Sequence, residues 1–512
     1  MRFDNSLLSL AFPALAASLD YNPTPTATID AGVVIGKATH LPNGLGPSVN
    51  QFLGIPFAQS PPERFSPPRN AAAFDKPINA TAFKPACVQQ FSYPLASQQF
   101  AKAVFNNPGG QPPMESEDCL YLNVYAPSGS PGGNGRAVMF WLYGGSLQFG
   151  TAGLPTYDGS AFAEYEDVIV VTTNYRTNVF GFPASPELPV TGQNLGFLDQ
   201  RFALDWVQRN IHAFGGDPTK VTIFGESAGA FSVDALLTSY PQNSKPPFRA
   251  AILQSGQYSY RTAPATSSVP AWNNLTASLG CPGTYGSNLM VFAVGQTNLS
   301  AFLQTNFGAA PSLIPAIAAA YPIGSPGITN GYDAISAVIT DITFQCPAAL
   351  WANATASIGI PTWRYYFNAS FSNTQAYPQL GAYHASEIPL VFRTYQSVNT
   401  TTQEFALSSF MQGAWARFAK NPLGGPGWNP VATGRAGPVL SGAYDQATGG
   451  WYYGTSGNLT SGDWNLGVLG DIGRVKGSGV TVLPQSQLDV RCNLFKPIYQ
   501  AFVGTAGIPP SL

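Results

Sequence analysis

The chain has 512 residues, and its 24 Lys and Arg nearly balance its 26 Asp and Glu. A net charge this close to zero offers no basic stripe to a phosphate backbone, so no nucleic acid is expected as a partner. Hydrophobic residues make up 45% of the chain and charged residues only 10%, with 53 glycines and 45 prolines. This composition is typical of a loop-rich globular protein and excludes a disordered one.

The first residues have the pattern of a secretory signal peptide. Arg2 precedes a short apolar run, and Ala14-Leu15-Ala16 matches an A-x-A cleavage site. We therefore expect residues 1–16 to be a signal peptide, residues 17–512 to form a single domain, and the mature protein to be extracellular. Seven Asn-x-Ser/Thr sequons favour this prediction over an ordinary N-terminal helix: Asn79, Asn274, Asn298, Asn353, Asn368, Asn399 and Asn458.

No later apolar run approaches the roughly 20 residues of a membrane span, so stable membrane insertion is not expected. Four apolar, β-branched runs predict buried strands: 137–142, 168–173, 221–224 and 250–253. Two helical patterns, 198–211 and 405–418, also follow from the spacing of apolar residues. Strands that alternate with helices predict an α/β fold, with a central, mostly parallel sheet flanked by helices in one large domain.

The strand at 221–224 runs into GESAG at 225–229 and then into a helical pattern. This strand, turn and helix context is the one that G-x-S-x-G requires for a nucleophile elbow, in which glycines let two backbones approach and hold the serine in a strained conformation. Ser227 is therefore the candidate nucleophile. The alternative is a serine in an ordinary glycine-rich turn.

These residues resemble a known family. FGGDP at 214–218 together with the elbow resembles the serine signature of type-B carboxylesterases, which include the cholinesterases and some fungal lipases. EDCLYLNVY at 117–125 and GIPFA at 54–58 resemble two further motifs of that family, and its secreted fungal members look most similar. The resemblance implies an α/β-hydrolase fold and hydrolysis of a small-molecule or lipid ester, with no cofactor and no metal.

The resemblance also assigns the remaining site residues. The strand at 137–142 ends in YGGS at 143–146, where the family usually has a third glycine in place of Ser146. Backbone N–H groups of Gly145, Ser146 and Ala228 are expected to form the oxyanion hole. Of the three histidines, His384 lies in a stretch similar to the family's catalytic loop, with Glu387 following it. His384 is the expected base, and a buried structural histidine is the alternative.

The other two histidines do not resemble a base: His40 lies before a predicted surface turn, and His212 leads into the serine motif. The cysteines have family counterparts. Cys87 and Cys119 resemble the pair that closes a flap beside the substrate entrance, and Cys346 and Cys492 resemble the late pair of cholinesterase-like members. Cys281 is left without a partner.

The carboxylate of a catalytic triad is missing from its expected place. From Ala235 to Tyr332 the chain contains no Asp or Glu, and Asn288 stands where the family pattern has Glu. One deletion near 281–291, natural or an error of the gene sequence, explains the short spacing, the lost acid and the odd Cys281. The substitutes to consider are Asp234, Asp333 and Asp341.

Two functions of different classes follow. The first is a secreted serine carboxylic ester hydrolase that works through an acyl-enzyme on Ser227, impaired by the loss of its acid. The second is a non-catalytic, cholinesterase-like binding or adhesion domain, which the missing acid favours. The presence of both Ser227 and His384 favours the enzyme.

Overall fold

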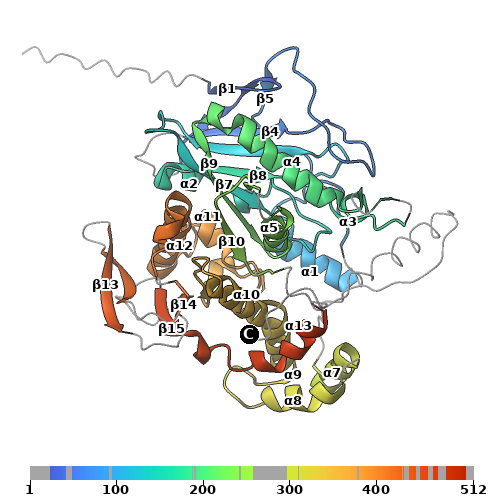
Figure 1. Ribbon diagram of the computed structural model, residues 1–512, viewed down its shortest axis with the longest axis vertical. Helices are drawn as coiled ribbons and strands as arrows, with labels where there is room; N and C mark the ends of the chain where they lie inside the picture. The colour runs from blue at the N-terminus through green and yellow to red at the C-terminus, as the bar shows by residue number, and fades with distance from the viewer. Residues whose placement is uncertain are drawn as a thin grey trace, which may run out of the picture.

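A computed structural model of the chain describes most residues between Thr24 and Phe502 (Figure 1). The described residues are 24–41, 49–91, 95–186, 188–189, 192–241, 244–257, 297–308, 311–377, 380–428, 430–431, 438–445, 450–458, 465–470 and 480–502. The expected signal peptide, Cys281, Asn288 and the expected deletion near 281–291 lie outside them. The division into residues 1–16 and 17–512 therefore stays a prediction.

The centre of the molecule is a seven-stranded sheet with the order β10-β9-β7-β8-β6-β4-β3. Its strands are β3 (Lys37–Thr39), β4 (Val49–Pro56), β6 (Tyr121–Pro127), β7 (Arg136–Leu142), β8 (Ile169–Thr173), β9 (Gly216–Glu226) and β10 (Ala250–Gln254). The four predicted strands are β7 to β10, and they pair in parallel. The pairings on the β6 side are antiparallel, so the sheet is mixed rather than mostly parallel.

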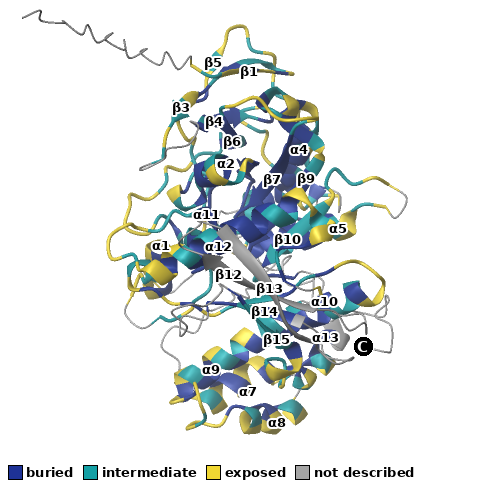
Figure 2. Ribbon diagram, turned by 90° about the vertical axis from the view of Figure 1, so that its left-hand side faces the viewer, coloured by how far each residue is buried: buried dark blue, intermediate teal, exposed yellow. Residues whose placement is uncertain are grey.

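Helices cover both faces of this sheet, as expected for the α/β-hydrolase fold. Met139 and Trp141 of β7 pack in one core with α11 (Ile388–Phe392) and α12 (Thr402–Lys420). Val138 and Phe140 point to the opposite face, into a core with α4 (Leu195–Asn210) and α5 (Ala228–Ser239). Because successive side chains alternate between faces, an entirely apolar strand needs two such cores, and β7 is buried along its whole length (Figure 2).

Further elements surround the sheet. Three smaller sheets consist of β1 (Thr26–Ile29), β2 (Gly32–Ile35) and β5 (Ile78–Asn79); β11 (Tyr365–Phe367), β14 (Asn465–Leu469) and β15 (Val480–Pro484); and β12 (Pro438–Asp445) with β13 (Gly450–Asn458). The other helices include α1 (Leu95–Phe105), α2 (Ser160–Glu166), α3 (Asn178–Gly181), α7 (Leu299–Phe307), α8 (Ile314–Ala320), α9 (Gly331–Thr340), α10 (Cys346–Ser357) and α13 (Lys496–Phe502). Residues of α7 to α10 and α13 share a separate hydrophobic core at the lower end of Figure 1.

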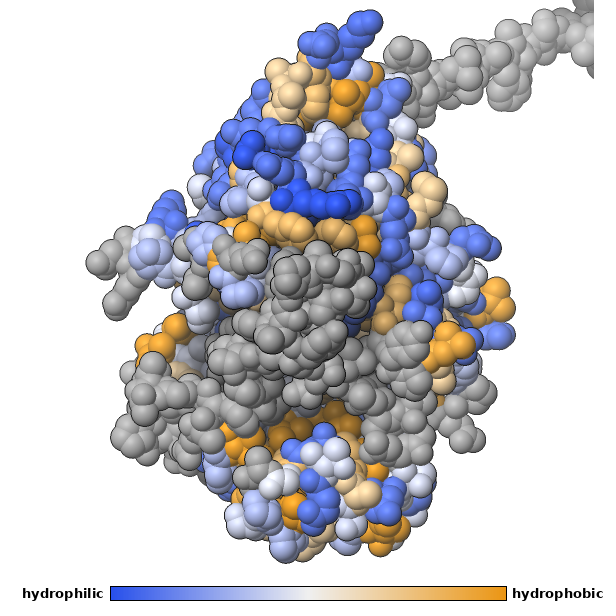
Figure 3. Space-filling model, turned by 90° about the vertical axis from the view of Figure 1, so that its right-hand side faces the viewer, coloured by the Kyte–Doolittle hydropathy of each residue, from blue (hydrophilic) through white to orange (hydrophobic). Residues whose placement is uncertain are grey.

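Two disulfides join distant parts of the chain, Cys87 to Cys119 and Cys346 to Cys492. These are the two pairings expected from the family resemblance. On the face in Figure 3, hydrophilic side chains cover much of the described surface, and hydrophobic ones form small groups between them.

One helical run among the described residues, Gly331–Ser357, is long and apolar enough to cross a membrane by length and composition alone. This run was not expected from the sequence. Within it, a π-helical turn, Asp341–Gln345, joins α9 to α10, and this turn carries polar residues that interrupt the apolar sequence. It contributes to the separate hydrophobic core, and Cys346 within it forms a disulfide. The core helix of a water-soluble protein meets the same length and composition criteria, so the absence of stable membrane insertion stays a prediction.

Candidate active site

Ser227 occupies the sharp turn between β9 and α5. Its φ of 54° and ψ of −119° lie outside the regions that a side chain normally allows. The flanking glycines make this turn possible. A Cβ on Gly229 would lie 1.9 Å from the carbonyl oxygen of Leu142, and one on Gly225 would lie 2.6 Å from the backbone of Gly229. The elbow predicted from GESAG is therefore present in the backbone geometry.

The loop after β7 lies directly against this serine. A Cβ on Gly144 would come within 3.0 Å of the Ser227 Cβ, so only glycine allows this approach. Gly145 has a φ of 113°, and a Cβ there would meet the Phe149 carbonyl oxygen at 2.1 Å. Ala228 is the first residue of α5, where backbone N–H groups have no partner within the helix. The loop that carries Gly145 and Ser146 thus begins against the Ser227 turn, and Ala228 follows the serine directly; the oxyanion hole itself stays a prediction.

Four non-glycine residues at this site have left-handed backbone conformations. Their φ angles are 56° at Ser146, 54° at Ser227, 54° at Ser255 and 70° at Ala385. Such conformations cost free energy and persist where the surrounding structure holds them, which is often at functional sites. Ser146 is the position where the family usually has glycine, and its positive φ explains that preference.

His384 lies beside the elbow, in the loop before α11. Its Nε2 is 3.0 Å from Oε1 of Glu226, the residue that precedes Ser227. The two atoms are close but not aligned for a hydrogen bond, and Glu226 Oε1 has no hydrogen-bond partner in the described part of the chain. The His384 side chain is 28% exposed, and the Phe344 ring lies 4.6 Å from its ring. Desolvation by these surroundings lowers the pKa of His384 to about 4, so its imidazole is neutral at neutral pH.

Two buried glutamates accompany His384. Burial raises the pKa of Glu226 well above its ordinary value, and the nearby Glu387 raises it further. Burial also raises the pKa of Glu387, although a hydrogen bond from Gln254 Nε2 at 3.1 Å opposes the effect. The backbone carbonyl of Gln254 accepts the Ser227 N–H at 2.8 Å. Gln254 therefore connects the elbow to the second glutamate.

Glu226 and Gln254 were not among the site residues expected from the sequence. Glu226 is the variable residue inside G-x-S-x-G, and its position next to Ser227 was the available signal. Gln254 is the last residue of β10, at the carboxyl edge of the sheet where the elbow also lies. No sequence motif marks this position, and only the pairing of β10 with β9 brings it to the site.

The three substitute acids are engaged away from His384. Asp234 is buried on α5 and accepts a hydrogen bond from Trp351 Nε1 at 3.2 Å. Asp333 lies at the surface in the first turn of α9, where its carboxylate accepts a hydrogen bond from the Thr329 N–H at 2.8 Å. Asp341 accepts hydrogen bonds from Tyr321, at 2.7 Å, and from Arg491, at 3.3 Å. The other two histidines, His40 and His212, are exposed.

The segment between Cys87 and Cys119 reaches His384. It includes α1, whose last residue, Phe105, places its ring 6.5 Å from the imidazole in an edge-on arrangement. Phe91 of the same segment stacks on Phe149 of the loop after β7, with ring centroids 4.9 Å apart. This disulfide-closed flap therefore borders the site, as expected from the sequence.

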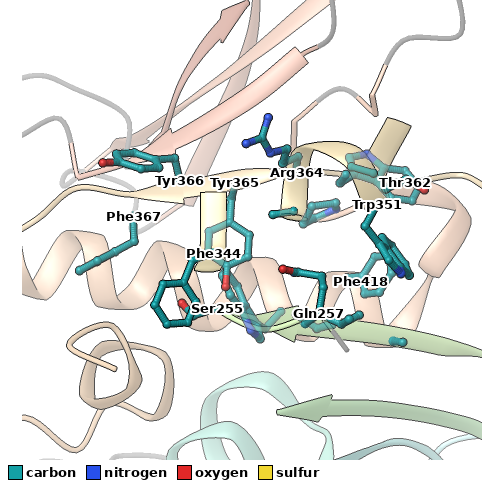
Figure 4. Close-up of a pocket in the computed structure, with 18 of the residues that line it drawn as sticks. Ser255, Gln257, Phe344, Trp351, Thr362, Arg364, Tyr365, Tyr366, Phe367 and Phe418 are labelled. Carbon is teal, nitrogen blue, oxygen red and sulfur yellow. The ribbon is translucent and has the colours of Figure 1, made fainter. Parts of the chain in front are cut away.

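A cavity of about 500 Å³ is lined in part by His384, and Figure 4 shows other residues of its lining. Aromatic side chains from α10, β11 and α12, among them Trp351, Tyr365 and Phe418, form much of its wall. Its size falls within the range of small-molecule pockets.

Comparison with known proteins identifies the family. The carboxylesterase family model matches residues 23–322 and 324–452, which is most of the chain. The chain belongs to the carboxylesterase family. It is 45% identical over 235 residues to carboxylesterase 5A of Canis lupus familiaris, a match that covers 45% of this chain and 39% of the relative.

Other relatives belong to two groups of the carboxylesterase family. Carboxylesterase 1D of Rattus norvegicus is 40% identical over 285 residues, covering 55% of this chain and 48% of the relative. Cholinesterase of Mus musculus is 47% identical over 214 residues, a match that covers 41% of this chain and 34% of the relative. The matched segments thus span less than half the length of these relatives.

Proposed function

We propose that this chain hydrolyses carboxylic esters through an acyl-enzyme on Ser227. The observation that carries the proposal is the strained Ser227 turn, with the glycine loop packed against it and His384 held beside it. Strain that holds a serine above the carboxyl edge of a parallel sheet is typical of a nucleophile and has no structural benefit of its own.

In the proposed reaction, the Ser227 Oγ attacks the ester carbonyl carbon while His384 takes the hydroxyl proton. N–H groups of Gly145, Ser146 and Ala228 stabilise the oxyanion, and the alcohol leaves with the proton returned by His384. Water then attacks the acyl-enzyme in the same way and releases the carboxylic acid. Because His384 is neutral at neutral pH, it can accept the first proton.

The proposed enzyme is slow. A triad carboxylate hydrogen-bonds to the imidazole, fixes its tautomer and stabilises the imidazolium. The Glu226 carboxyl group contacts His384, but it is not aligned for a hydrogen bond, and its raised pKa disfavours the ionised form. Its position therefore does not replace the missing acid.

A fluorophosphonate probe tests this proposal, because it reacts with an activated serine and needs no knowledge of the substrate. We expect the purified protein to be labelled at Ser227 and Ser227→Ala to abolish labelling. Ser255→Ala is the matched control, since Ser255 has the same φ of 54° but lies outside the G-x-S-x-G motif. The proposal is supported if the wild type and Ser255→Ala are labelled and Ser227→Ala is not.

The second candidate is a non-catalytic binding or adhesion domain, which the missing triad acid favours. A binding domain should not be labelled by the fluorophosphonate even when it is folded, whereas an intact esterase, used as the positive control, should be labelled under the same conditions. Hydrolysis of p-nitrophenyl acetate, measured with the same proteins, separates a slow enzyme from a binding domain.

We further propose that the protein is secreted and glycosylated. Four sequons, at Asn79, Asn298, Asn368 and Asn399, are exposed, and two disulfides are typical of an oxidising compartment. Asn353 is half-buried and its side chain accepts a hydrogen bond from Gln485 at 2.9 Å. Glycopeptide mapping of secreted protein should find glycans at the exposed sites and none at Asn353; an unglycosylated, intracellular product would contradict the proposal.

A further inference from the structure

The loop after β7 contains three successive residues in left-handed conformations. Their φ angles are 113° at Gly145, 56° at Ser146 and 60° at Leu147. This conformation is unfavourable for a residue with a side chain, so a run that includes two such residues needs bonds to the surrounding structure. The proposed reaction uses the N–H groups of Gly145 and Ser146, and whatever holds the run also sets the direction of these groups.

Both ends of this left-handed run are hydrogen-bonded to one segment, residues 175–178, which follows β8. Before the run, the backbone carbonyl of Tyr143 accepts a hydrogen bond from the Tyr175 hydroxyl at 2.8 Å. At its end, the carbonyl of Leu147 accepts one from the Asn178 N–H at 2.7 Å. Because a peptide unit is planar, fixing the Tyr143 carbonyl also fixes the N–H of the next residue. The segment therefore controls how the chain enters and leaves the run.

The two tyrosines bind each other reciprocally. Tyr143 donates its hydroxyl to the backbone carbonyl of Tyr175 at 3.0 Å and accepts the Tyr175 N–H at 3.3 Å. Their rings stack, with centroids 4.3 Å apart and planes 13° from parallel. Both side chains are fully buried, and burial raises the pKa of both hydroxyls, which therefore stay protonated and able to donate.

The segment that holds the loop is itself fixed to the fold. Arg176 forms a buried ion pair with Asp199 of α4 through two side-chain hydrogen bonds of 2.8 Å. Directly before the segment, the Asn174 side chain accepts the Ala152 N–H at 2.8 Å and donates to the carbonyl of Cys119 at 3.0 Å. These attachments to a helix and to the flap disulfide give the segment a rigid base from which to hold a strained loop.

A third tyrosine of the same hydrophobic core shows that packing alone does not require a paired hydroxyl. Tyr125 of β6 is fully buried, and its hydroxyl has no hydrogen-bond partner in the described part of the chain. The hydroxyls of Tyr143 and Tyr175 instead make three hydrogen bonds, all to backbone groups of each other. These bonds orient backbone, in addition to filling the core.

We propose that Tyr175 is a positioning residue for the oxyanion hole, with Tyr143 as its partner in a reciprocal clamp. This inference rests on the proposed function, because it assigns a role in stabilising the oxyanion of that reaction. The Tyr175 hydroxyl does not touch the substrate. It holds the Tyr143 carbonyl, so that the N–H groups of Gly145 and Ser146 are in place before an ester binds and need no reorganisation as the oxyanion forms.

Hydrogen exchange of backbone amides in the full chain tests the clamp without any activity. The amides of Gln148, Phe149 and Asn178 are hydrogen-bonded within the loop or to it, and in the wild type they should exchange at least about tenfold more slowly than unbonded amides. Tyr175→Phe removes only the hydroxyl and should speed their exchange at least about tenfold. Fast exchange of these amides in the wild type, or unchanged exchange in the folded variant, would overturn the clamp.

The kinetics of fluorophosphonate labelling test whether the clamp acts on the reaction. The measured quantities are the maximal rate constant of labelling, kinact, and the probe concentration that gives half of this rate, KI. Tyr175→Phe should lower kinact at least about tenfold and leave KI unchanged, because the N–H groups stabilise the negative oxygen that forms when Ser227 attacks phosphorus. Tyr125→Phe, which removes the unpaired hydroxyl, is the matched control and should change neither quantity.

Tyr143→Phe separates positioning from the loss of a buried hydrogen bond. It should lower the Tm as Tyr175→Phe does, but it leaves the bond from the Tyr175 hydroxyl to the loop carbonyl in place, so kinact should fall by less than about threefold. Equal losses of kinact in the two variants would show general destabilisation and overturn the proposal. An unlabelled wild type whose loop amides exchange slowly, and faster in Tyr175→Phe, would refute the proposed function while supporting the clamp.

Discussion

Replacing Glu226 with Gln tests whether the carboxyl group beside His384 acts as the triad acid. The change keeps the size and shape of the side chain and removes only the ability to ionise. Burial and the neighbouring Glu387 raise the pKa of Glu226 well above its ordinary value, which disfavours the carboxylate form that a triad acid needs. Its Oε1 is 3.0 Å from His384 Nε2 without hydrogen-bond alignment.

The expected magnitude follows from these two facts. Loss of an ionised, hydrogen-bonded triad carboxylate costs on the order of 10⁴ in turnover, roughly 5 kcal/mol of barrier. The raised pKa of Glu226 disfavours its ionised form and its carboxyl group is not aligned with the imidazole, so Glu226→Gln should slow the reaction by less than about tenfold, or roughly 1.4 kcal/mol. His384→Asn removes the base itself and should slow it by at least about 10³.

The assay is the rate of fluorophosphonate labelling at Ser227, with kcat/KM for p-nitrophenyl acetate as a second measurement. Thermal unfolding of each variant confirms that the protein is folded. A loss of 10³ or more in Glu226→Gln, with an unchanged Tm, would refute this reasoning. In that case Glu226 would be the working acid despite its burial.

Three further predictions concern protonation, stability and the missing segment. Labelling of Ser227 should be constant from pH 8 to about 5 and fall as the pH drops through about 4, because protonation of His384 removes the base; a midpoint near 6.5 would contradict the desolvation of the ring. Asp199→Asn should lower the free energy of unfolding, measured in urea, by about 3–5 kcal/mol, because it leaves the guanidinium of Arg176 buried without its carboxylate. A loss below about 1 kcal/mol would show that this ion pair contributes little to stability. Sequencing the transcript across codons 270 to 300 should recover an insert with a Glu-Gly and a cysteine. Restoring this insert should raise esterase activity by on the order of 10⁴ and make Cys281 resistant to alkylation. Full activity of the chain as it stands would contradict the loss of the triad acid.

The sequence alone determined those features that depend on local chemistry. GESAG after an apolar strand predicted the elbow at Ser227, because only glycine can occupy positions where a Cβ would meet the Leu142 carbonyl oxygen at 1.9 Å. The runs that became β7 to β10 were identified because apolar, β-branched runs are typical of strands in a parallel sheet. The expected helices at 198–211 and 405–418 correspond to α4 and α12, with their ends shifted by a few residues.

Only the tertiary structure decided how distant segments meet at the site. His384 and Glu226 are 158 positions apart, and no local pattern states that their side chains approach to 3.0 Å. The pKa of each depends on burial, which is a property of the packed protein and not of the segment. Likewise, no motif marks Gln254, and only the pairing of β10 with β9 brings it to the elbow. Strand pairing across long sequence separations depends on the whole fold, so the sequence could not place Gln254 at the site.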